Sequence, residues 1–345
     1  MVKKMFKLDT KEKNEAVNFA TLMNVLDCTE QRLDPLFSEL SKKIDVSIPL
    51  VDNNLISLYS DYFKVEIFSL KEAYEYARQA FFSLRDNDEI IKRGNQDYPP
   101  LLAQTEHSPR FLYVRGKKSL LYEKRTVALV GSRQASDSSK KNTQQLANKL
   151  GENGIVIISG LAKGIDVSAH SEALMGGYNT IAVVGTNLNQ YYPIENREIQ
   201  ILIEKKGLVV SQFSPANRTQ RWFFPLRNSV MSGLSLATII MEAGETSGAL
   251  KQADYALKQN RMVMIPEASL NNPSISWPAK YVKKGAVTFK TPLDVLRKLA
   301  ESEIFKPINS NESQQTIDDL LSGIAIESKP TRKKMVNHIL LNGDW

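Results

Sequence analysis

The sequence predicts an α/β protein whose core is a mostly parallel β-sheet covered by helices on both faces. From residue 126 onwards, short apolar runs rich in β-branched residues alternate with stretches of helical periodicity. Continuous apolar runs indicate strands buried on both faces, and their alternation with helices is typical of a doubly wound, Rossmann-like sheet. The runs are TVALV (126–130), IVII (155–158), TIAVV (180–184), LVVS (208–211), ATIIM (237–241), MVMI (262–265) and AVTF (286–289).

The first 90 residues predict a smaller helical domain. They contain few glycines, and apolar residues recur at helical spacing in three stretches. We interpret these stripes as the domain's own core rather than as a partner-binding face. The stripes are Ala16, Phe19, Ala20, Met23 and Leu26; then Leu33, Leu36, Phe37, Leu40 and Ile44; then Leu70, Ala73, Ala77, Ala80, Phe81 and Leu84.

The α/β domain is predicted over residues 91–300, and residues 301–345 are predicted to form a linker and a short C-terminal tail. The linker begins with the polar sequence KPINSNESQQ, and the tail holds a short helical candidate (316–321) and a basic run, KPTRKK (329–334). About 45 residues leave little room for another independent domain, so we expect no full winged helix there.

Composition limits the class of protein. Cys28 is the only cysteine among the 345 residues, which excludes an intramolecular disulfide and favours a reducing compartment. No stretch approaches the roughly 20 apolar residues of a membrane span, and the first residues lack the apolar segment of a secretory signal. We therefore expect a cytoplasmic protein without a membrane partner. The net charge of +7 favours polyanionic partners, although charge alone is weak evidence.

Three loops that follow predicted strands have the residues of anion sites. In an open parallel sheet, ligands bind at the carboxyl ends of the strands. The loops are GSRQAS (131–136), SGLAKGID (159–166) and EAGETSGAL (242–250), and they combine glycines, hydroxyls and cations with the start of a helix. Neither G-x-G-x-x-G nor G-K-[ST] is present, so a standard dinucleotide or nucleoside-triphosphate site is not supported, and no cofactor is expected.

A fourth segment, residues 211–235, interleaves cations with aromatic residues. Arg218, Arg221 and Arg227 alternate with Trp222, Phe223 and Phe224. This pattern suits single-stranded nucleic acid, because aromatic rings stack on bases for about 1–3 kcal/mol each. The alternative is a buried aromatic cluster that anchors a long loop. We prefer the cluster for Phe224 and leave both readings open for Arg221 and Trp222.

The carboxylates near these loops need a separate interpretation. Asp166 and His170 are four residues apart on one predicted helix, but no third ligand or adjacent nucleophile accompanies them. We therefore expect structural hydrogen bonds, with Asp166 capping its helix, and predict no catalytic or metal site. Glu242 and Glu245 would repel phosphate if they pointed inward, so we expect them to pair with neighbouring cations.

Taken together, the motifs resemble those of the DprA/Smf family of DNA-processing proteins. The resemblance covers roughly residues 90–270 and rests on GSR, SGLAKGID with AH, a YP after the third strand, FPLRN and EAGETSGAL, preceded by DYPPLLAQTEHSPRFLYVRG (97–116). The chain departs from the family pattern in several places. Ser229 stands where the family has the second arginine of RNR, and Lys251 and Gln252 stand where it has Thr-Ala.

The resemblance implies a non-catalytic protein that binds single-stranded DNA, protects incoming DNA and assists a RecA-type recombinase, notably in natural transformation. It also implies a homodimer formed through the Rossmann-like domain. The DNA-binding residues that we predict from the loops and the resemblance are Gly131, Ser132, Arg133, Gly160, Lys163, Gly164, Arg221, Arg227, Asn228, Ser247 and Gly248.

One alternative comes from another functional class. Related Rossmann-like folds resemble enzymes that hydrolyse nucleotides and nucleotide sensors of phage defence. In such a protein Glu242 or Asp166 would be the catalytic carboxylate. The glycine-rich Pro-Gly-Gly-x-Gly-Thr phosphate turn of these enzymes is not found in the sequence.

Overall fold

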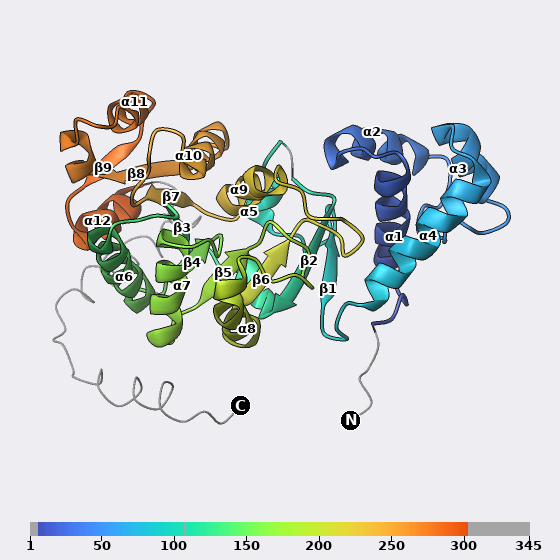
Figure 1. Ribbon diagram of the computed structural model, residues 1–345, viewed down its shortest axis with the longest axis horizontal. Coiled ribbons are helices and arrows are strands. Elements are labelled where there is room, and N and C mark those ends of the chain that lie inside the picture. The colour runs from blue at the N-terminus through green and yellow to red at the C-terminus, as the bar shows by residue number, and fades with distance from the viewer. Residues whose placement is uncertain (1–5, 107, 303–345) are drawn as a thin grey trace, which may run out of the picture. The chain divides into compact units, whose positions relative to one another are not determined.

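The computed structural model describes residues 6–106 and 108–302. Its described part contains a nine-stranded sheet in the order β1-β2-β6-β5-β4-β3-β7-β8-β9 (Figure 1). Strands β3 to β9 pair in parallel, as the apolar runs predicted. Their bounds are β3 Thr126–Val130, β4 Val156–Ser159, β5 Thr180–Val183, β6 Leu208–Ser211, β7 Ala237–Ile240, β8 Met262–Pro266 and β9 Val287–Phe289.

The strand order reverses between β3 and β7. From β3 the chain proceeds through β4 and β5 to β6 on one side, and it then returns to place β7, β8 and β9 on the other side. At such a reversal, the loops that follow the two adjacent strands run in opposite directions, and a crevice opens between them at the carboxyl ends of the strands. The loops after β3 and β7 therefore border this topological switch point.

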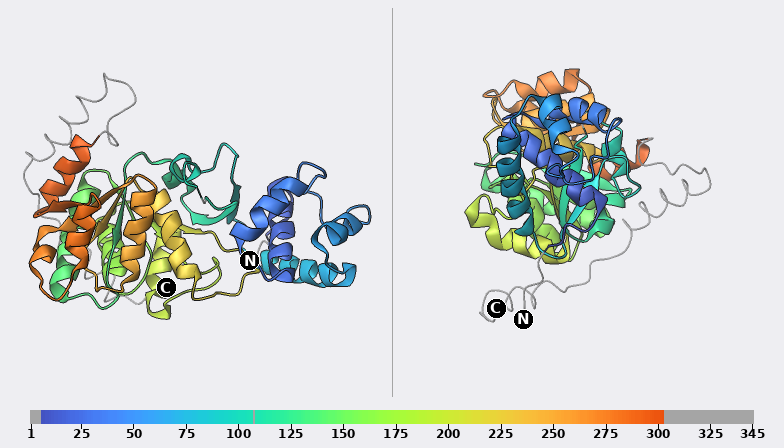
Figure 2. Two further views of the ribbon diagram at one scale, coloured as in Figure 1. Left: turned by 90° about the horizontal axis from the view of Figure 1, so that it is seen from above. Right: turned by 90° about the vertical axis from the view of Figure 1, so that its right-hand side faces the viewer.

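Helices cover both faces of the parallel sheet, as expected for a doubly wound fold (Figure 1). Helices α6, α7 and α8 form one layer, while α9 and α10 contact each other and lie on the other face. Two further views show the same two layers (Figure 2). The bounds are α6 Asp137–Glu152, α7 Ile165–Met175, α8 Arg197–Lys206, α9 Phe223–Gly233, α10 Gly248–Lys258, α11 Trp277–Lys283 and α12 Pro292–Glu301.

Two antiparallel strands extend the sheet beyond β6, and the sequence analysis did not predict them. Strand β1 (Glu89–Lys92) pairs with β2 (Phe111–Gly116), which pairs with β6. Strand β2 is buried from Phe111 to Arg115, and the Arg115 guanidinium binds both carboxylate oxygens of Asp88 at 2.6 and 2.7 Å. A short helix, α5 (Pro100–Ala103), and three 3-10 turns, η1 (Lys118–Tyr122), η2 (Ile194–Asn196) and η3 (Glu267–Asn271), complete the connections.

The N-terminal part is helical, as predicted. It consists of α1 (Lys11–Val25), α2 (Glu30–Leu40), α3 (Ile56–Phe63) and α4 (Ile67–Phe82), of which α3 was not predicted. Most of the predicted stripe residues are buried, but Leu36 is 46% exposed and does not belong to the core.

The helices and the edge of the sheet share one cluster of buried apolar side chains. Phe19 of α1 contacts Phe37 of α2 and Phe111 of β2 edge to face, with ring centroids 5.2 and 5.8 Å apart. Next to this cluster, Arg110 donates a hydrogen bond to Asp34 at 2.7 Å and forms an ion pair with Glu15 at 3.0 Å. The helical stripes thus pack against the sheet as well as against each other. The domain boundary at residue 90 stays a prediction.

The predictions for the tail beyond residue 302 lie outside the described residues. Within the described ranges, no helix is long and apolar enough to cross a membrane.

Candidate nucleic-acid interface

The loops after β3 and β7 meet at the switch point. The backbone N–H of Ser132 donates to the carbonyl of Glu242 at 2.7 Å, and the carbonyl of Ser132 accepts from the N–H of Ile165 at 3.3 Å. These bonds tie the first loop to the β7 loop and to the start of α7. Beside them lies an open hollow of about 740 Å³, bounded by both loops, α9 and the first turns of α10.

The hollow brings together most of the predicted DNA-binding residues. They come from three segments that lie far apart in the sequence, which supports the expectation that the strand-end loops meet at one edge. The predicted residues that line the hollow are Gly131, Ser132, Arg133, Arg221, Arg227, Asn228, Ser247 and Gly248. Gly160, Lys163 and Gly164 are not among its lining residues.

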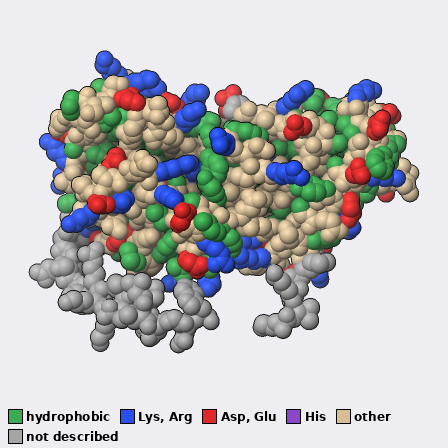
Figure 3. Space-filling model, viewed as in Figure 1, with side chains coloured by type: hydrophobic (Ala, Val, Ile, Leu, Met, Phe, Trp, Pro, Cys, Tyr) green, Lys and Arg blue, Asp and Glu red, His purple; other side chains and the backbone are tan. Residues whose placement is uncertain are grey.

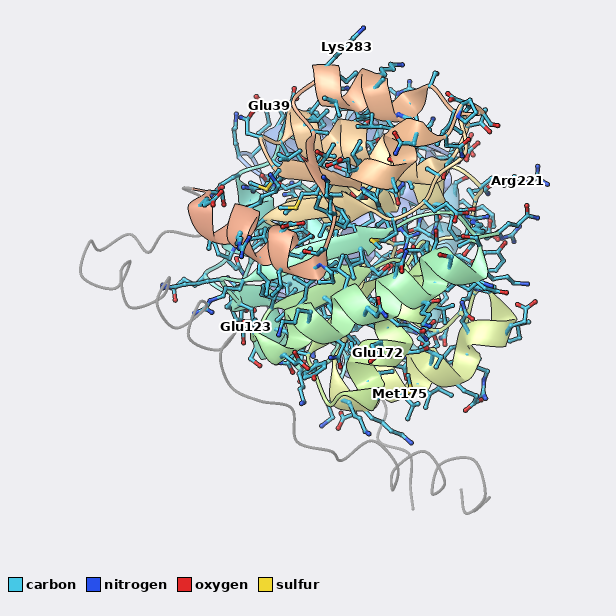
Figure 4. All side chains as sticks on the ribbon, turned by 90° about the vertical axis from the view of Figure 1, so that its left-hand side faces the viewer. Glu39, Glu123, Glu172, Met175, Arg221 and Lys283 are labelled. Atoms are coloured by element: carbon cyan, nitrogen blue, oxygen red, sulfur yellow. The ribbon has the colours of Figure 1, made fainter. Side chains whose placement is uncertain are left out.

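Three cations in the hollow are exposed and available to a ligand. Among the described residues, no carboxylate forms an ion pair with Arg133, Arg221 or Lys251, and all three side chains are exposed. Figure 4 shows Arg221 extending away from the fold, at the opposite end from Glu123, which precedes β3. The free cations thus occupy the carboxyl edge of the sheet, where phosphate could replace their water shell.

The start of helix α10 adds hydrogen-bond donors to the same hollow. Ser247 is the N-cap residue, and its hydroxyl accepts a bond from the N–H of Ala249 at 3.3 Å. Gly248 is exposed, and a Cβ at this position would meet no atom within 4 Å. The helix dipole and the open N–H edge favour a negative group here, next to Lys251 one turn further along α10.

Aromatic rings border the cations of the hollow. The Arg133 guanidinium lies over the Phe224 ring at 5.9 Å, and Phe224 contacts Tyr192 with centroids 5.0 Å apart. Figure 3 shows Lys and Arg side chains beside hydrophobic ones near the middle of the described surface. The cation–π contact keeps Arg133 oriented while its charge stays unneutralised.

The three aromatic residues 222–224 differ in burial, and so in whether they suit base stacking or an anchoring cluster. Phe223 is buried and stacks on Phe213 at 3.8 Å, so it belongs to an anchoring cluster. Phe224, which was assigned to that cluster, is only half-buried and lines the hollow. Trp222 is 42% exposed and lines the neighbouring surface rather than the core.

Arg227 and Asn228 are placed below the surface of the hollow. Arg227 is 5% exposed, and its guanidinium donates to the carbonyls of Gly160 and Val183, which end strands β4 and β5. Burial lowers the pKa of Arg227 to about 10, partly opposed by the nearby Asp166. Asn228 donates to the carbonyl of Gly248 at 3.2 Å. Both residues hold the loops in place.

The glycine-rich loop after β4 is filled by the protein itself. A Cβ on Gly160 would lie within 3.0 Å of three guanidinium atoms of Arg227, and one on Gly164 would collide with the Ser132 carbonyl. Gly164 also has φ +79°, which disfavours other residues. Lys163 is exposed and forms an ion pair with Glu195 at 2.6 Å, so it is not free in this arrangement.

The carboxylates near the site are held in structural bonds, although not always the predicted ones. Asp166 accepts from the N–H groups of Gly160 and Ala162, so it braces the loop before α7, whose N-cap residue is Gly164. His170 hydrogen-bonds Thr180 at 2.8 Å, and burial lowers the pKa of His170 to about 3. The described residues hold no group of three His, Cys, Asp or Glu side chains able to bind a metal.

The prediction that Glu242 and Glu245 pair with cations is wrong. Glu242 accepts from the hydroxyl of Ser136 at 2.6 Å and from its N–H at 3.2 Å, at the start of α6. Glu245 accepts from the N–H groups of Ser276 and Trp277, at the start of α11. Hydrogen bonds at these helix N-termini outweigh the effect of burial and lower the pKa of both carboxylates, and the more distant charges of Lys140 and Lys280 lower it further. Neither carboxylate lines the hollow.

The sequence analysis missed Lys251 as a site residue and treated it only as a departure from a family pattern. Ser247 and Lys251 are four residues apart, so they share a helix face. A helix predicted to start at Ser247 would have placed Lys251 beside the anion site. Tyr192 was noted only as part of a turn, and no spacing rule connects it to the hollow.

Comparison with known proteins bears directly on this site. A model of the family described as DNA recombination-mediator protein A matches residues 89–300. The chain belongs to this family. The matched range includes every strand that borders the hollow and all eleven predicted site residues.

Curated relatives support the assignment. The chain is 31% identical to the DNA processing protein DprA of Bacillus subtilis over 214 residues, which is 62% of the chain and 72% of that protein. It is 36% identical to DprA of Streptococcus pneumoniae over 58% of the chain and 70% of that protein. It is 37% identical to the Protein Smf of Synechocystis over 51% of the chain, but the match spans only 45% of that longer relative.

Solved structures confirm the fold. The X-ray structure of DprA from Streptococcus pneumoniae aligns with a TM-score of 0.64 at 28% identity, over 84% of this chain and 95% of the other. DNA processing protein A from Helicobacter pylori, whose structure gave insights into its single-stranded DNA binding mode, aligns with a TM-score of 0.55 at 28% identity, over 61% and 95%. The predicted resemblance and fold class are thereby confirmed.

Proposed function

We propose that the chain binds single-stranded DNA in the hollow at the switch point, and that it does so without catalysis. The observation that carries this proposal is the set of unpaired cations, Arg133, Arg221 and Lys251, around the open N-terminus of α10. Phosphates would bind these groups, while Phe224 and Tyr192 offer rings to the bases. The binding mode described for the Helicobacter pylori relative supports the choice of a single strand.

Catalysis is the less favoured function because the available carboxylates are already engaged. Asp166 is buried under the loop after β4, and Glu242 faces the start of α6. Glu242 does not line the hollow, and Asp166, which does, accepts hydrogen bonds from the N–H groups of Gly160 and Ala162 and so braces the loop after β4. If incubation with nucleotides or DNA gave a product whose formation required Glu242, the alternative of a nucleotide-hydrolysing site would replace this proposal.

The test is fluorescence anisotropy on labelled oligonucleotides at several salt concentrations. Three phosphate contacts predict a slope of roughly −2 for log Kobs against log salt, at about −0.7 per contact. The double variant Arg133→Ala/Lys251→Ala should reduce the magnitude of this slope by about 1.4 and weaken binding roughly 10- to 100-fold.

The matched control removes two charges from the opposite edge of the sheet. Lys117 follows β2 beside the start of β6, and Lys124 lies just before β3, so both are exposed at the amino ends of the parallel strands. Lys117→Ala/Lys124→Ala should leave affinity and slope nearly unchanged. Equal losses in the two double variants, or equal binding of single- and double-stranded DNA, would contradict the proposal.

We further propose that the bound strand is handed to a RecA-type recombinase and that the protein acts as a homodimer. The family description as a recombination mediator supports the first part. Filament assembly by a RecA-type protein on strands coated with single-strand-binding protein should accelerate with this chain and not with the Arg133/Lys251 variant. Sedimentation would report the dimer, and transformation and repair assays on a deletion strain would assign the pathway.

A further inference from the structure

A second open space lies on the other side of helix α9, outside the predicted site. This groove has a volume of about 650 Å³ and is bounded by α1, α2, β2, the loop after β6, α9 and α10. Its walls are largely aromatic and apolar, with Phe19, Phe111, Phe213, Trp222 and Tyr255 among them. Of the residues that line this groove, the proposed function uses Lys251 alone.

The groove is continuous with the hollow at the switch point. Pro225 of α9 and Lys251 of α10 line both spaces. Helix α9 separates them: Phe224 and Asn228 face the hollow, whereas Leu226 and Ser229 face the groove. A chain leaving the hollow over Pro225 would therefore meet Lys251 at the crossing and enter the groove.

The two spaces differ in charge, and the difference indicates which part of a strand each would hold. Free cations dominate the hollow, whereas the groove contains the carboxylates of Glu30, Asp34 and Glu106. Asp34 is neutralised by Arg93 at 2.5 Å, and Glu30 accepts a bond from the N–H of Arg110 at 2.5 Å. Phosphates gain little in such a lining. Bases gain much more, because rings stack on aromatic side chains and their amino groups donate to carboxylates.

We propose that this groove is an additional binding site for the bases of the same single strand, with Trp222 and Tyr255 as stacking platforms and Lys251 holding the phosphate at the crossing. The proposal rests on the proposed function, since the strand reaches the groove through the hollow. Trp222 is 42% exposed and Tyr255 lies one helical turn after Lys251, so both rings are accessible from the crossing. Burial raises the pKa of Glu30 to about 7, which keeps part of this carboxyl protonated at neutral pH and limits repulsion of the strand.

The experiment compares short and long oligonucleotides of deoxycytidylate, whose bases carry the amino group that a carboxylate accepts from. Strands of about 4 nucleotides fill the hollow alone, and strands of about 12 reach the groove, within the range of known single-strand site sizes. The variants Trp222→Leu and Tyr255→Leu keep apolar bulk but remove the stacking ring. Each should weaken binding of the long strand at least about 5-fold, as expected for one lost stacking contact, and leave the short strand unchanged. Phe68→Leu, at a ring 69% exposed outside the groove, is the control and should change neither affinity.

The outcomes separate this inference from the proposed function. Short strands that fail to bind, or that bind independently of Arg133, overturn the proposed function. If short strands bind through Arg133 but neither ring variant weakens binding of the long strand, the groove proposal alone is overturned. This result would be found if a protein segment occupied the groove. Equal losses for short and long strands would also overturn it, because they would show that the rings only support the fold of the hollow.

Discussion

Gly160 and Arg227 form a pair whose coupling can be measured. The guanidinium of Arg227 lies directly beside Gly160, donates to its carbonyl and to that of Val183, and is buried at the floor of the hollow. Gly160→Ala would place a Cβ within 3.0 Å of three guanidinium atoms, closer than real Cβ atoms approach their neighbours. The guanidinium must therefore move, and it can do so only by giving up these hydrogen bonds.

The size of the effect follows from these two bonds. Hydrogen bonds to a charged group contribute about 1.5–3 kcal/mol each, so losing both should lower the free energy of unfolding by about 3 kcal/mol or more. For a chain of this size each kcal/mol lowers Tm by about 2–4 °C, which predicts a decrease of roughly 6–12 °C. In the background Arg227→Leu, whose side chain is too short to reach Gly160, the same Gly160→Ala change should cost less than about 1 kcal/mol.

Urea denaturation followed by circular dichroism would give the four free energies of the cycle. Gly248→Ala is the matched control, because no atom lies within 4 Å of its added Cβ, and it should change stability by less than about 0.5 kcal/mol. If Gly160→Ala costs the same with and without Arg227, the buried guanidinium does not fill the space beside Gly160, and the assignment of Arg227 as a residue that holds the strand ends is refuted.

Two further predictions concern pH. Burial raises the pKa of Glu30 from 4.5 to about 7, so between pH 4.5 and 7 the folded protein keeps a proton that the unfolded chain loses. The free energy of unfolding should therefore fall by up to about 3 kcal/mol as pH rises from 4.5 to 7. Urea titrations of wild type and Glu30→Gln at about pH 5 and 7.5 should show the loss in wild type only. Burial lowers the pKa of His170 from 6.5 to about 3, so the unfolded chain takes up a proton that the folded protein excludes. The free energy of unfolding should therefore fall by about 2–3 kcal/mol as pH falls from about 6.5 to 4.5. His170→Asn should remove most of this decline, and an unchanged decline in that variant would contradict the prediction.

The parallel part of the fold could be predicted because each of its strands has a recognisable pattern of apolar residues in the local sequence. All seven apolar runs are strands with bounds close to those predicted, since strands buried on both faces must be continuously apolar. Strand β1 lacks this signature, because its sequence EIIK has only two apolar residues between two charged ones. Strand β2 has a short apolar run, but the run ends in Arg115, whose burial depends on Asp88 and Glu204 from distant parts of the chain. Such partners are invisible to a pattern along one strand.

The sequence predicted where the candidate site lies, but not which of its side chains are buried. Parallel topology places strand-end loops at one edge, which is why residues that follow β3, β4, β5, β6 and β7 line one hollow. Whether an arginine in these loops faces water depends on the helix that carries it. Arg227 shares a face of α9 with Phe223 and Met231, four residues before and after it, and this spacing indicates burial. Arg227 interleaves with aromatic residues in the sequence as Arg221 does, but Arg227 is buried and Arg221 is exposed.

Burial also determines how the net charge should be interpreted. A cation contributes to the salt dependence of DNA binding only if a phosphate can replace its counterion. Arg110, Arg115 and Arg227 are buried and donate to carboxylates or carbonyls of the protein itself, and Lys163 is paired with Glu195. The free cations of the hollow number three, whereas the formal net charge is +7. A salt slope near −2 would therefore measure the hollow, and a slope near −5, which is about seven times −0.7, would mean that strands are attracted by the whole surface and that the geometry of the switch point decides little.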